Sequence, residues 1–195
     1  RKKNILVFDK SFGGDDLSAA FKKKHCPYKI YIMQRRYLGT IFNYYFQNYL
    51  GTIDESKYDN LKESFATKIE YRKFLFKVFK KLKKILNLRT IISFNIFYIA
   101  ERELQFVAKD LNLKFIVHMK ESIHWGQKKI SNLIHWKKYF RPMPLANISV
   151  YNKYTKELIS SAKLIDKNKI KIVGMPRTDY YFNLRKNIKD NYIIF

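Results

Sequence analysis

The sequence predicts an α/β domain built on a mainly parallel, six-stranded sheet flanked by helices. Two observations support this fold class. First, short runs that are apolar throughout alternate with segments of helical periodicity, and strands without a polar face belong in a parallel sheet that is covered on both sides. Second, hydrophobic residues make up 47% of the 195 residues, which is enough for a well-buried core.

Each strand is expected at a compact apolar run, and helices are expected over residues 17–24, 71–87, 100–112 and 153–165, with a further aromatic-rich helical pattern between the second strand and residue 71. Six strands of this kind are the size of a Rossmann-like domain. The expected strands are Asn4–Phe8, Lys29–Gln34, Arg89–Ile96, Lys114–Lys120, Ala146–Asn152 and Lys169–Gly174.

The end of the chain is expected to leave this domain. Residues 183–190 are polar and charged like a linker, and Asn191–Phe195 has the composition of a new strand. We therefore expect residues 1–182 to form one Rossmann-like domain, and residues 183–195 to be a linker and the first strand of a second, missing domain.

The charge balance restricts the partners. Forty Lys and Arg residues against 16 Asp and Glu give a net charge of +24, which favours nucleic acid, anionic lipid or phosphate-bearing substrates. A single cysteine, Cys26, excludes an intramolecular disulfide and a cysteine-only zinc site. The sequence contains no run of about 18 apolar residues, the length that spans a bilayer.

The stretch Tyr71–Asn87 is a basic amphipathic helix. Its apolar residues recur at helical spacing, and seven Lys and Arg residues with no acidic residue occupy the other positions. Such a helix either lies on a membrane surface or packs its apolar side on the sheet with its lysines in water. The helix can also do both, if it packs its apolar side on the sheet while its exposed lysines contact anionic lipid. We expect a cytoplasmic protein, peripheral at the inner face of the membrane.

Ligands of an open parallel sheet bind beyond the carboxyl ends of its strands, so the residues that follow each strand are the site candidates. After the first strand, Gly13, Gly14 and Asp16 form a turn before a helix, where backbone amides can bind an anion of the substrate. This loop lacks both the G-x-G-x-x-G spacing and the Walker lysine.

The richest candidate segment follows the fourth strand. We expect Glu121 to be the general base that activates a hydroxyl, with His118 as the second candidate, because both come directly after a strand. The alternative is a solvated Lys–Glu pair and a histidine packed on Trp125. No metal site is expected, because no third ligand accompanies the two histidines of this segment. The expected substrate-binding residues here are Lys120, Ser122 and His124.

The last expected strand leads into the segment "VGMPRTDYYF". A plain loop would need only its glycine and its proline, so the arginine and the aspartate that follow require a further explanation. This segment resembles the turn of bacterial glycerophosphotransferases of the teichoic acid polymerase type and of related transferases of surface polysaccharide synthesis. The resemblance implies that Gly174 and Pro176 turn the chain, while Arg177 and Asp179 form a hinge or a wall of the substrate cleft. Those transferases carry a Trp-His-Gly segment where this chain has "HMKESIHWG".

The resemblance implies the N-terminal, acceptor-binding half of a GT-B fold transferase acting in capsule or surface polysaccharide synthesis. A lipid-linked or glycan acceptor would bind here. The nucleotide-activated donor, a sugar or a polyol, would bind in the missing half, so this domain would hold no cofactor and the 195 residues alone would be inactive.

Two other functions remain open. A nucleotide-sugar epimerase has the same architecture. A basic nucleic-acid-binding module would explain the net charge and the many Tyr and Phe residues. No RNA-recognition, KH or helix-turn-helix signature is present in the sequence, so we expect no specific nucleic-acid partner.

Overall fold

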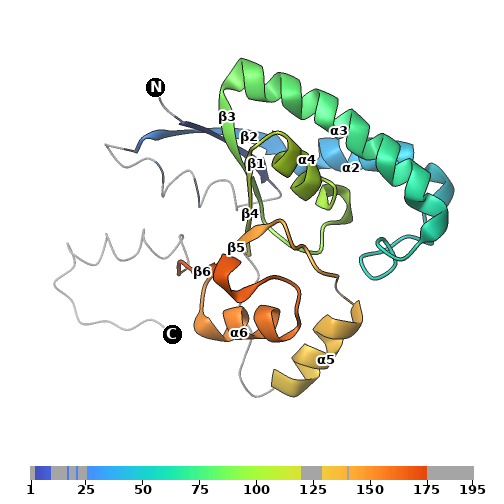
Figure 1. The fold of residues 1–195 in the computed structure, drawn as a ribbon, viewed down its shortest axis with the longest axis vertical. Helices are drawn as coiled ribbons and strands as arrows, with labels where there is room; N and C mark the ends of the chain where they lie inside the picture. Colours follow the sequence, from blue (N-terminus) through green and yellow to red (C-terminus); the bar gives the residue numbers. More distant parts are fainter. Residues whose placement is uncertain are drawn as a thin grey trace, which may run out of the picture.

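The computed structural model describes residues 3–9, 17, 21, 26–119, 129–139 and 141–174 (Figure 1). In this part of the chain, six strands form one sheet in the order β2-β1-β3-β4-β5-β6, and every neighbouring pair is parallel. The predicted α/β, Rossmann-like fold class is thereby confirmed. The strands are β1 (Lys3–Asp9), β2 (Tyr28–Gln34), β3 (Leu88–Ser93), β4 (Lys114–His118), β5 (Asn147–Val150) and β6 (Ile170–Ile172).

The strands begin within one residue of the positions that the apolar runs predict. β1 shows why these runs lack a polar face: Ile5, Leu6, Val7 and Phe8 are at most 4% exposed, although successive residues point to opposite faces. Such a strand needs cover on both sides, which a central position in a parallel sheet gives it. Its neighbours are β2 on one side and β3 on the other.

The strand order reverses at β1. The chain passes from β1 to β2 in one direction and then returns across β1 to β3, from which every later strand is added on the same side. Because such connections are right-handed, all helices after β2 belong on one face of the sheet, opposite the β1–β2 connection. The carboxyl ends of β1 and β3 at this reversal point are the usual ligand position of an open α/β sheet.

The described helices follow this rule. Buried residues from all of them join one core cluster with Leu6, Phe8, Phe115 and Val117 of the sheet. The other face has its own cluster, in which Ile5, Val7, Ile92 and Phe94 pack with Leu17. The helices are α2 (Arg35–Tyr45), α3 (Phe65–Leu86), α4 (Leu104–Asp110), α5 (Lys129–Tyr139) and α6 (Lys153–Ser161).

α3 is the long helix at the upper right of Figure 1, and it packs its apolar side inward. Tyr71, Leu75 and Phe79, spaced four residues apart, are at most 1% exposed. Asn87 ends the helix in the left-handed conformation, at φ 47°, which asparagine tolerates better than most residues. Within the described ranges, no helix has both the length and the apolar character needed to cross a bilayer.

Four helices differ from the sequence prediction, one of them only at its end: α6 stops at Ser161 and not at residue 165. α3 begins at Phe65, six residues before the predicted start. The helix predicted from Ala100 begins only at Leu104, after a single 3-10 turn (Ile99–Glu101). α5 was not predicted, since its apolar residues do not share one side: Trp136 is buried and Ile134 is 61% exposed.

The core position of α3 gives a stability prediction. We expect Leu75→Ala to lower the free energy of unfolding by about 2–5 kcal/mol, because it leaves a cavity at a position that is 1% exposed. Lys77→Ala, on the exposed side of the same helix, should stay within about 0.5 kcal/mol of the parent. Urea denaturation measures both. Equal losses for the two variants would contradict the assigned burial of α3.

Candidate functional site

Of the residues predicted to form the site, the structure describes His118. The others lie outside the described residues: Gly13, Gly14, Asp16, Lys120, Glu121, Ser122, His124, Arg177 and Asp179. Of the turn after β6, Gly174 is described and has φ +72°, a left-handed conformation that favours glycine. The rest of the predicted turn lies outside the described residues, so the change of chain direction stays a prediction.

His118 is the last residue of β4 and points to the face opposite the helices, since Val117 and Met119 belong to the helix-side core. Its side chain is buried: the residue is 5% exposed. The ring nitrogen Nδ1 lies 2.7 Å from the Ser149 hydroxyl of the neighbouring strand β5. The ring centroids of Phe94 and Tyr151 lie 6.2 and 5.6 Å from that of the imidazole, so the histidine is packed between residues at the ends of the two neighbouring strands, β3 and β5.

A second polar group gathers at the same edge, on the helix side of the sheet. The Glu101 carboxylate accepts hydrogen bonds from the Ser93 hydroxyl at the end of β3 and, at 2.6 Å, from Arg35 Nε at the start of α2. The Arg35 guanidinium also stacks on the Tyr98 ring, 3.5 Å from its centroid. This group ties together the ends of β2 and β3, which flank β1 at the reversal point of the sheet.

Burial dominates the electrostatics of this group. Glu101 is 1% exposed, and the loss of hydration raises the pKa of its carboxyl from 4.5 to about 7, although Ser93 and Arg35 favour the charged form. A carboxyl with such a pKa takes up or releases a proton near neutral pH. Because it is enclosed, Glu101 can position Arg35 and Ser93 but does not contact a ligand directly.

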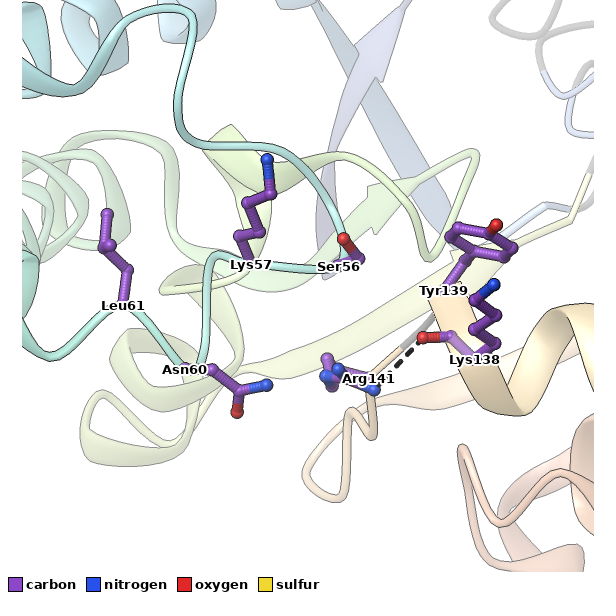
Figure 2. A pocket seen from close by; sticks show the side chains of 7 residues that line it. All are labelled: Ser56, Lys57, Asn60, Leu61, Lys138, Tyr139 and Arg141. Atoms are coloured by element: carbon purple, nitrogen blue, oxygen red, sulfur yellow. Dashed lines mark hydrogen bonds between the residues drawn. The ribbon is translucent and has the colours of Figure 1, made fainter.

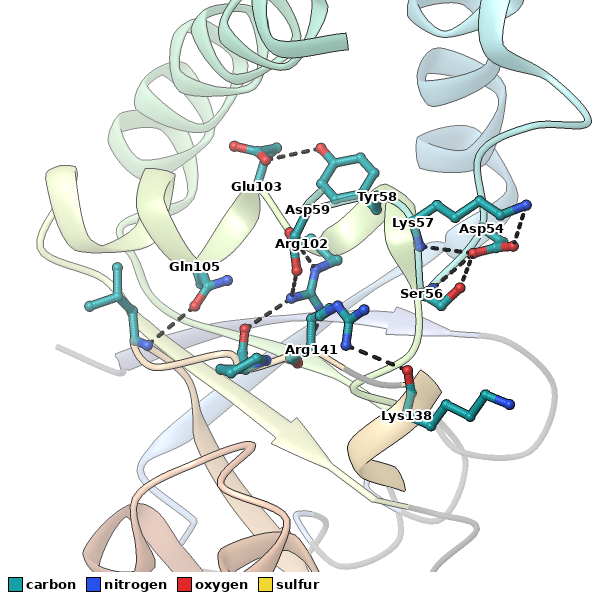
Figure 3. Close-up of polar contacts among 12 residues, drawn as sticks. Asp54, Ser56, Lys57, Tyr58, Asp59, Arg102, Glu103, Gln105, Lys138 and Arg141 are labelled. Atoms are coloured by element: carbon teal, nitrogen blue, oxygen red, sulfur yellow. Dashed lines mark hydrogen bonds and ion pairs between the residues drawn. The ribbon is translucent and has the colours of Figure 1, made fainter. Parts of the chain in front are cut away.

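The residues after Glu101 bond to three other parts of the fold, two of which Figure 3 shows. Arg102 binds the Asp59 carboxylate at 2.5 Å and the Pro142 carbonyl at 2.9 Å. The Glu103 carboxylate accepts bonds from the Tyr58 hydroxyl and from Arg72 of α3. The 54–61 loop and the segment before β5 are therefore both fixed to the connection that leaves the carboxyl end of β3.

Gln105 completes this set, since its Oε1 accepts a hydrogen bond from the Leu145 backbone amide. We call residues 101–105 the polar segment. Glu101, Arg102, Glu103 and Gln105 are each at most 4% exposed, which is rare for these residue types unless they are paired.

The sequence prediction missed the polar segment because Glu-Arg-Glu has the composition of a solvated helix surface. One signal was available. The chain has only 16 acidic residues against 40 basic ones. An arginine with a glutamate on each side, in the connection that follows an apolar strand, therefore stands out from the rest of the chain.

The group at Glu101, like His118, lies at the carboxyl edge of the parallel sheet, and together they define a Rossmann-like α/β protein whose candidate site is that edge. The chain matches no protein-family model and has no significant match among curated proteins. Within the described residues, no group of three or more His, Cys, Asp or Glu side chains can hold a metal ion. The resemblance of the turn after β6 to polysaccharide transferases stays a prediction.

The raised pKa of Glu101 makes stability depend on pH with a definite sign. The native state holds a proton that the unfolded state releases above about pH 4.5, so this contribution is complete below 4.5 and is lost as the pH rises through about 7. The loss is on the order of 3 kcal/mol. In Glu101→Gln, whose amide keeps both bonds without titrating, the free energy of unfolding should fall less over this range.

Denaturant titrations at a series of pH values test this. Glu70→Gln is the control, because Glu70 is an exposed carboxylate on α3, 61% exposed and paired with Lys73. It should keep the slope of the parent. If Glu101→Gln and the parent have the same pH profile, Glu101 does not carry the buried proton.

Proposed function

We propose that this chain is the acceptor-binding, N-terminal half of a GT-B type transferase that acts in surface polysaccharide synthesis. The observation that supports this most is the fixed His118–Ser149 pair at the carboxyl edge of an all-parallel Rossmann-like sheet. That edge is where folds of this class bind substrates. The proposed donor is a nucleotide-activated sugar or polyol, and the proposed acceptor is lipid-linked or a glycan.

The proposed reaction needs a base beside an acceptor hydroxyl. Glu121, three residues past the end of β4 and outside the described residues, takes the hydroxyl proton, with His118 as the alternative base. The acceptor oxygen then bonds to the reacting carbon or phosphorus of the donor. The nucleotide leaves with the electron pair of the broken bond. The proposed substrate-binding residues are Gly13, Gly14, Asp16, Lys120, Ser122, His124, Arg177 and Asp179.

The packing of His118 limits its part in this scheme. A histidine that is 5% exposed and bonded to Ser149 is suited to orienting its neighbours, whereas a base must reach the acceptor oxygen. The proposal therefore keeps Glu121 as the base and gives His118 the task of fixing the start of the segment that carries it.

Enzyme assays test the transferase proposal on the complete gene product, with any segment that follows Phe195 included. Glu121→Gln should lower the turnover number by about 10²–10⁴-fold, the usual worth of general-base catalysis, with an unchanged melting temperature. Glu55→Gln, an exposed carboxyl in the 54–61 loop, is the control and should keep full activity.

Other results would redirect the proposal. Normal turnover of Glu121→Gln together with a large loss in His118→Asn would move the base to His118. Conversion of a nucleotide sugar without any acceptor would identify an epimerase instead. Failure of the complete protein to release nucleotide from any activated sugar or polyol, with membranes present as acceptor, would contradict the transferase.

The exposed side of α3 supports an anionic membrane surface as the second partner. Because Tyr71, Leu75 and Phe79 are used by the core, α3 does not insert its apolar side into lipid, and its lysines remain for contact with lipid phosphates. Residues 71–100 contain no acidic residue. Each lysine near such a surface contributes about 1 kcal/mol. The exposed lysines of α3 are Lys73, Lys77, Lys80, Lys81 and Lys84.

Vesicle co-sedimentation tests this partner. The chain should bind phosphatidylserine-containing vesicles, less so at high salt, and the fourfold change of Lys77, Lys80, Lys81 and Lys84 to Glu should abolish binding. The control makes the same change of charge at exposed lysines away from α3, namely Lys114, Lys153, Lys167 and Lys171. Equal effects of the two variants would show that net charge, and no specific surface, drives binding.

A further inference from the structure

A small basic pocket lies between the 54–61 loop and the end of α5 (Figure 2). Its volume is about 340 Å³, near the lower limit of small-molecule sites. Three of its lining residues are cationic and none is acidic. The lining residues are Ser56, Lys57, Asn60, Leu61, Lys138, Tyr139 and Arg141. We call this cavity the basic pocket.

Both walls of the basic pocket are fixed to the polar segment (Figure 3). On the loop side, Asp59 binds Arg102, and Tyr58 binds Glu103. On the other side, Arg102 donates to the backbone carbonyls of Arg141 and Pro142. One buried arginine thus sets the separation of the two walls, so a ligand does not have to order them and its affinity is not reduced by that cost.

The loop wall has a defined local structure as well. The Asp54 carboxylate accepts hydrogen bonds from the backbone amides of Ser56 and Lys57 and from the Ser56 hydroxyl. Ser56 and Asn60 line the pocket on this wall, and the Asn60 side chain points toward Arg141 (Figure 2). The Ser56 hydroxyl hydrogen is used by Asp54, and the Lys57 ammonium lies beside Asp54 and points away from Arg141 in Figure 2. The donor left for a ligand on this wall is therefore the Asn60 amide.

Arg141 is the centre of the pocket and has an unused donor. Its Nε is buried and has no hydrogen-bond partner among the described residues. One terminal nitrogen makes a long bond of 3.5 Å to the Lys138 carbonyl. A guanidinium is always charged, and leaving a buried donor without an acceptor is destabilising. Because this nitrogen is enclosed, an anion in the basic pocket would meet the terminal nitrogens of the guanidinium and neutralise its charge.

Little negative charge competes for these cations. Lys57 lies 3.4 Å from Asp54, but the two side chains are 59% and 46% exposed, so the pair is weak. Asp59 is used by Arg102. The Lys138 ammonium lies over the Tyr139 ring, 5.1 Å from its centroid, and is paired with no carboxylate that the structure describes. The pocket therefore has an excess of positive charge.

We propose that the basic pocket binds the phosphoryl group of a phosphate monoester. Arginine and lysine together are the usual phosphate ligands, the guanidinium by paired hydrogen bonds and the ammonium as a point charge. Leu61 and the Tyr139 ring give the carbon part of a small ester an apolar surface. The group comes either from a free phosphorylated metabolite or from a lipid headgroup, and the proposal does not depend on the transferase reaction.

Calorimetric titration of the chain with glycerol 3-phosphate, at constant ionic strength, tests the free form. Arg141→Met and Lys138→Met should each weaken binding about tenfold or more, because each removes a charged hydrogen bond to phosphate. Lys137→Met is the matched control: it removes the same charge from the neighbouring exposed position of α5, which does not line the pocket, and should leave the affinity unchanged. Lys138→Met also provides the test if Arg141→Met fails to fold.

Vesicles of phosphatidylcholine with phosphatidic acid test the lipid form. Binding that Lys138→Met and Arg141→Met abolish, and that the fourfold α3 variant keeps, would assign the pocket to a lipid headgroup. If Lys137→Met weakens the binding of glycerol 3-phosphate as much as Lys138→Met does, only the net charge of the protein determines the affinity. That result, or the absence of binding in both arms, would overturn the proposal. Neither bears on the transferase assays, so the two proposals fail separately.

Discussion

The Arg102 guanidinium is the contact on which the arrangement of the domain depends most. Its side chain is 5% exposed and bonds to Asp59 between α2 and α3 and to the backbone carbonyls before β5. A charge removed from water is costly unless its hydrogen bonds are met, and here a carboxylate and two carbonyls meet them. Since these partners come from segments about 40 residues away on either side, one side chain fixes connections that the sheet itself does not join.

Glu101 and Glu103, on either side of Arg102, bond to further elements of the fold. Glu101 reaches the start of α2 through Arg35, and Glu103 reaches α3 through Arg72 and the 54–61 loop through Tyr58. Buried polar groups of this kind stabilise less than an apolar core of equal volume, but they exclude packings in which any one partner is lost. The Arg35–Glu101 group at the carboxyl edge and the basic pocket both take their geometry from these few residues.

The sheet could be predicted from sequence because its signal is local. A run such as Ile5–Phe8, apolar at every position, has few alternatives to a buried parallel strand, and the strand starts were right to within one residue. The start of α4 was wrong because Glu101 and Arg102 have the composition of a helix surface and no local pattern shows that their partners are distant. α5 was missed for a related reason, since Ile134 and Trp136 lie on different sides of a short helix.

The same limit applies to the candidate site. The position of His118 at the end of β4 could be predicted from the strand pattern. Its bond to Ser149 could not, because it depends on which strand lies beside β4, and the order of strands in a sheet is not apparent from the sequence of one chain. Arg141 carried no signal at all. Its significance comes from an unpaired nitrogen enclosed by residues of two separate connections.

The central place of β1 also affects how the chain acquires its structure. β1 pairs with β2 about 25 residues away, but its second neighbour, β3, brings Ile91 opposite Leu6 across most of the first half of the chain. During synthesis, β1, whose Ile5–Phe8 are buried in the folded domain, therefore has one edge unpaired for seconds while α2 and α3 are made. Long-range pairings of this kind slow folding and expose strand edges to other chains. Until β3 has been synthesised as far as Ser93, a chaperone bound to the open edge of β1 would prevent it from pairing with another chain.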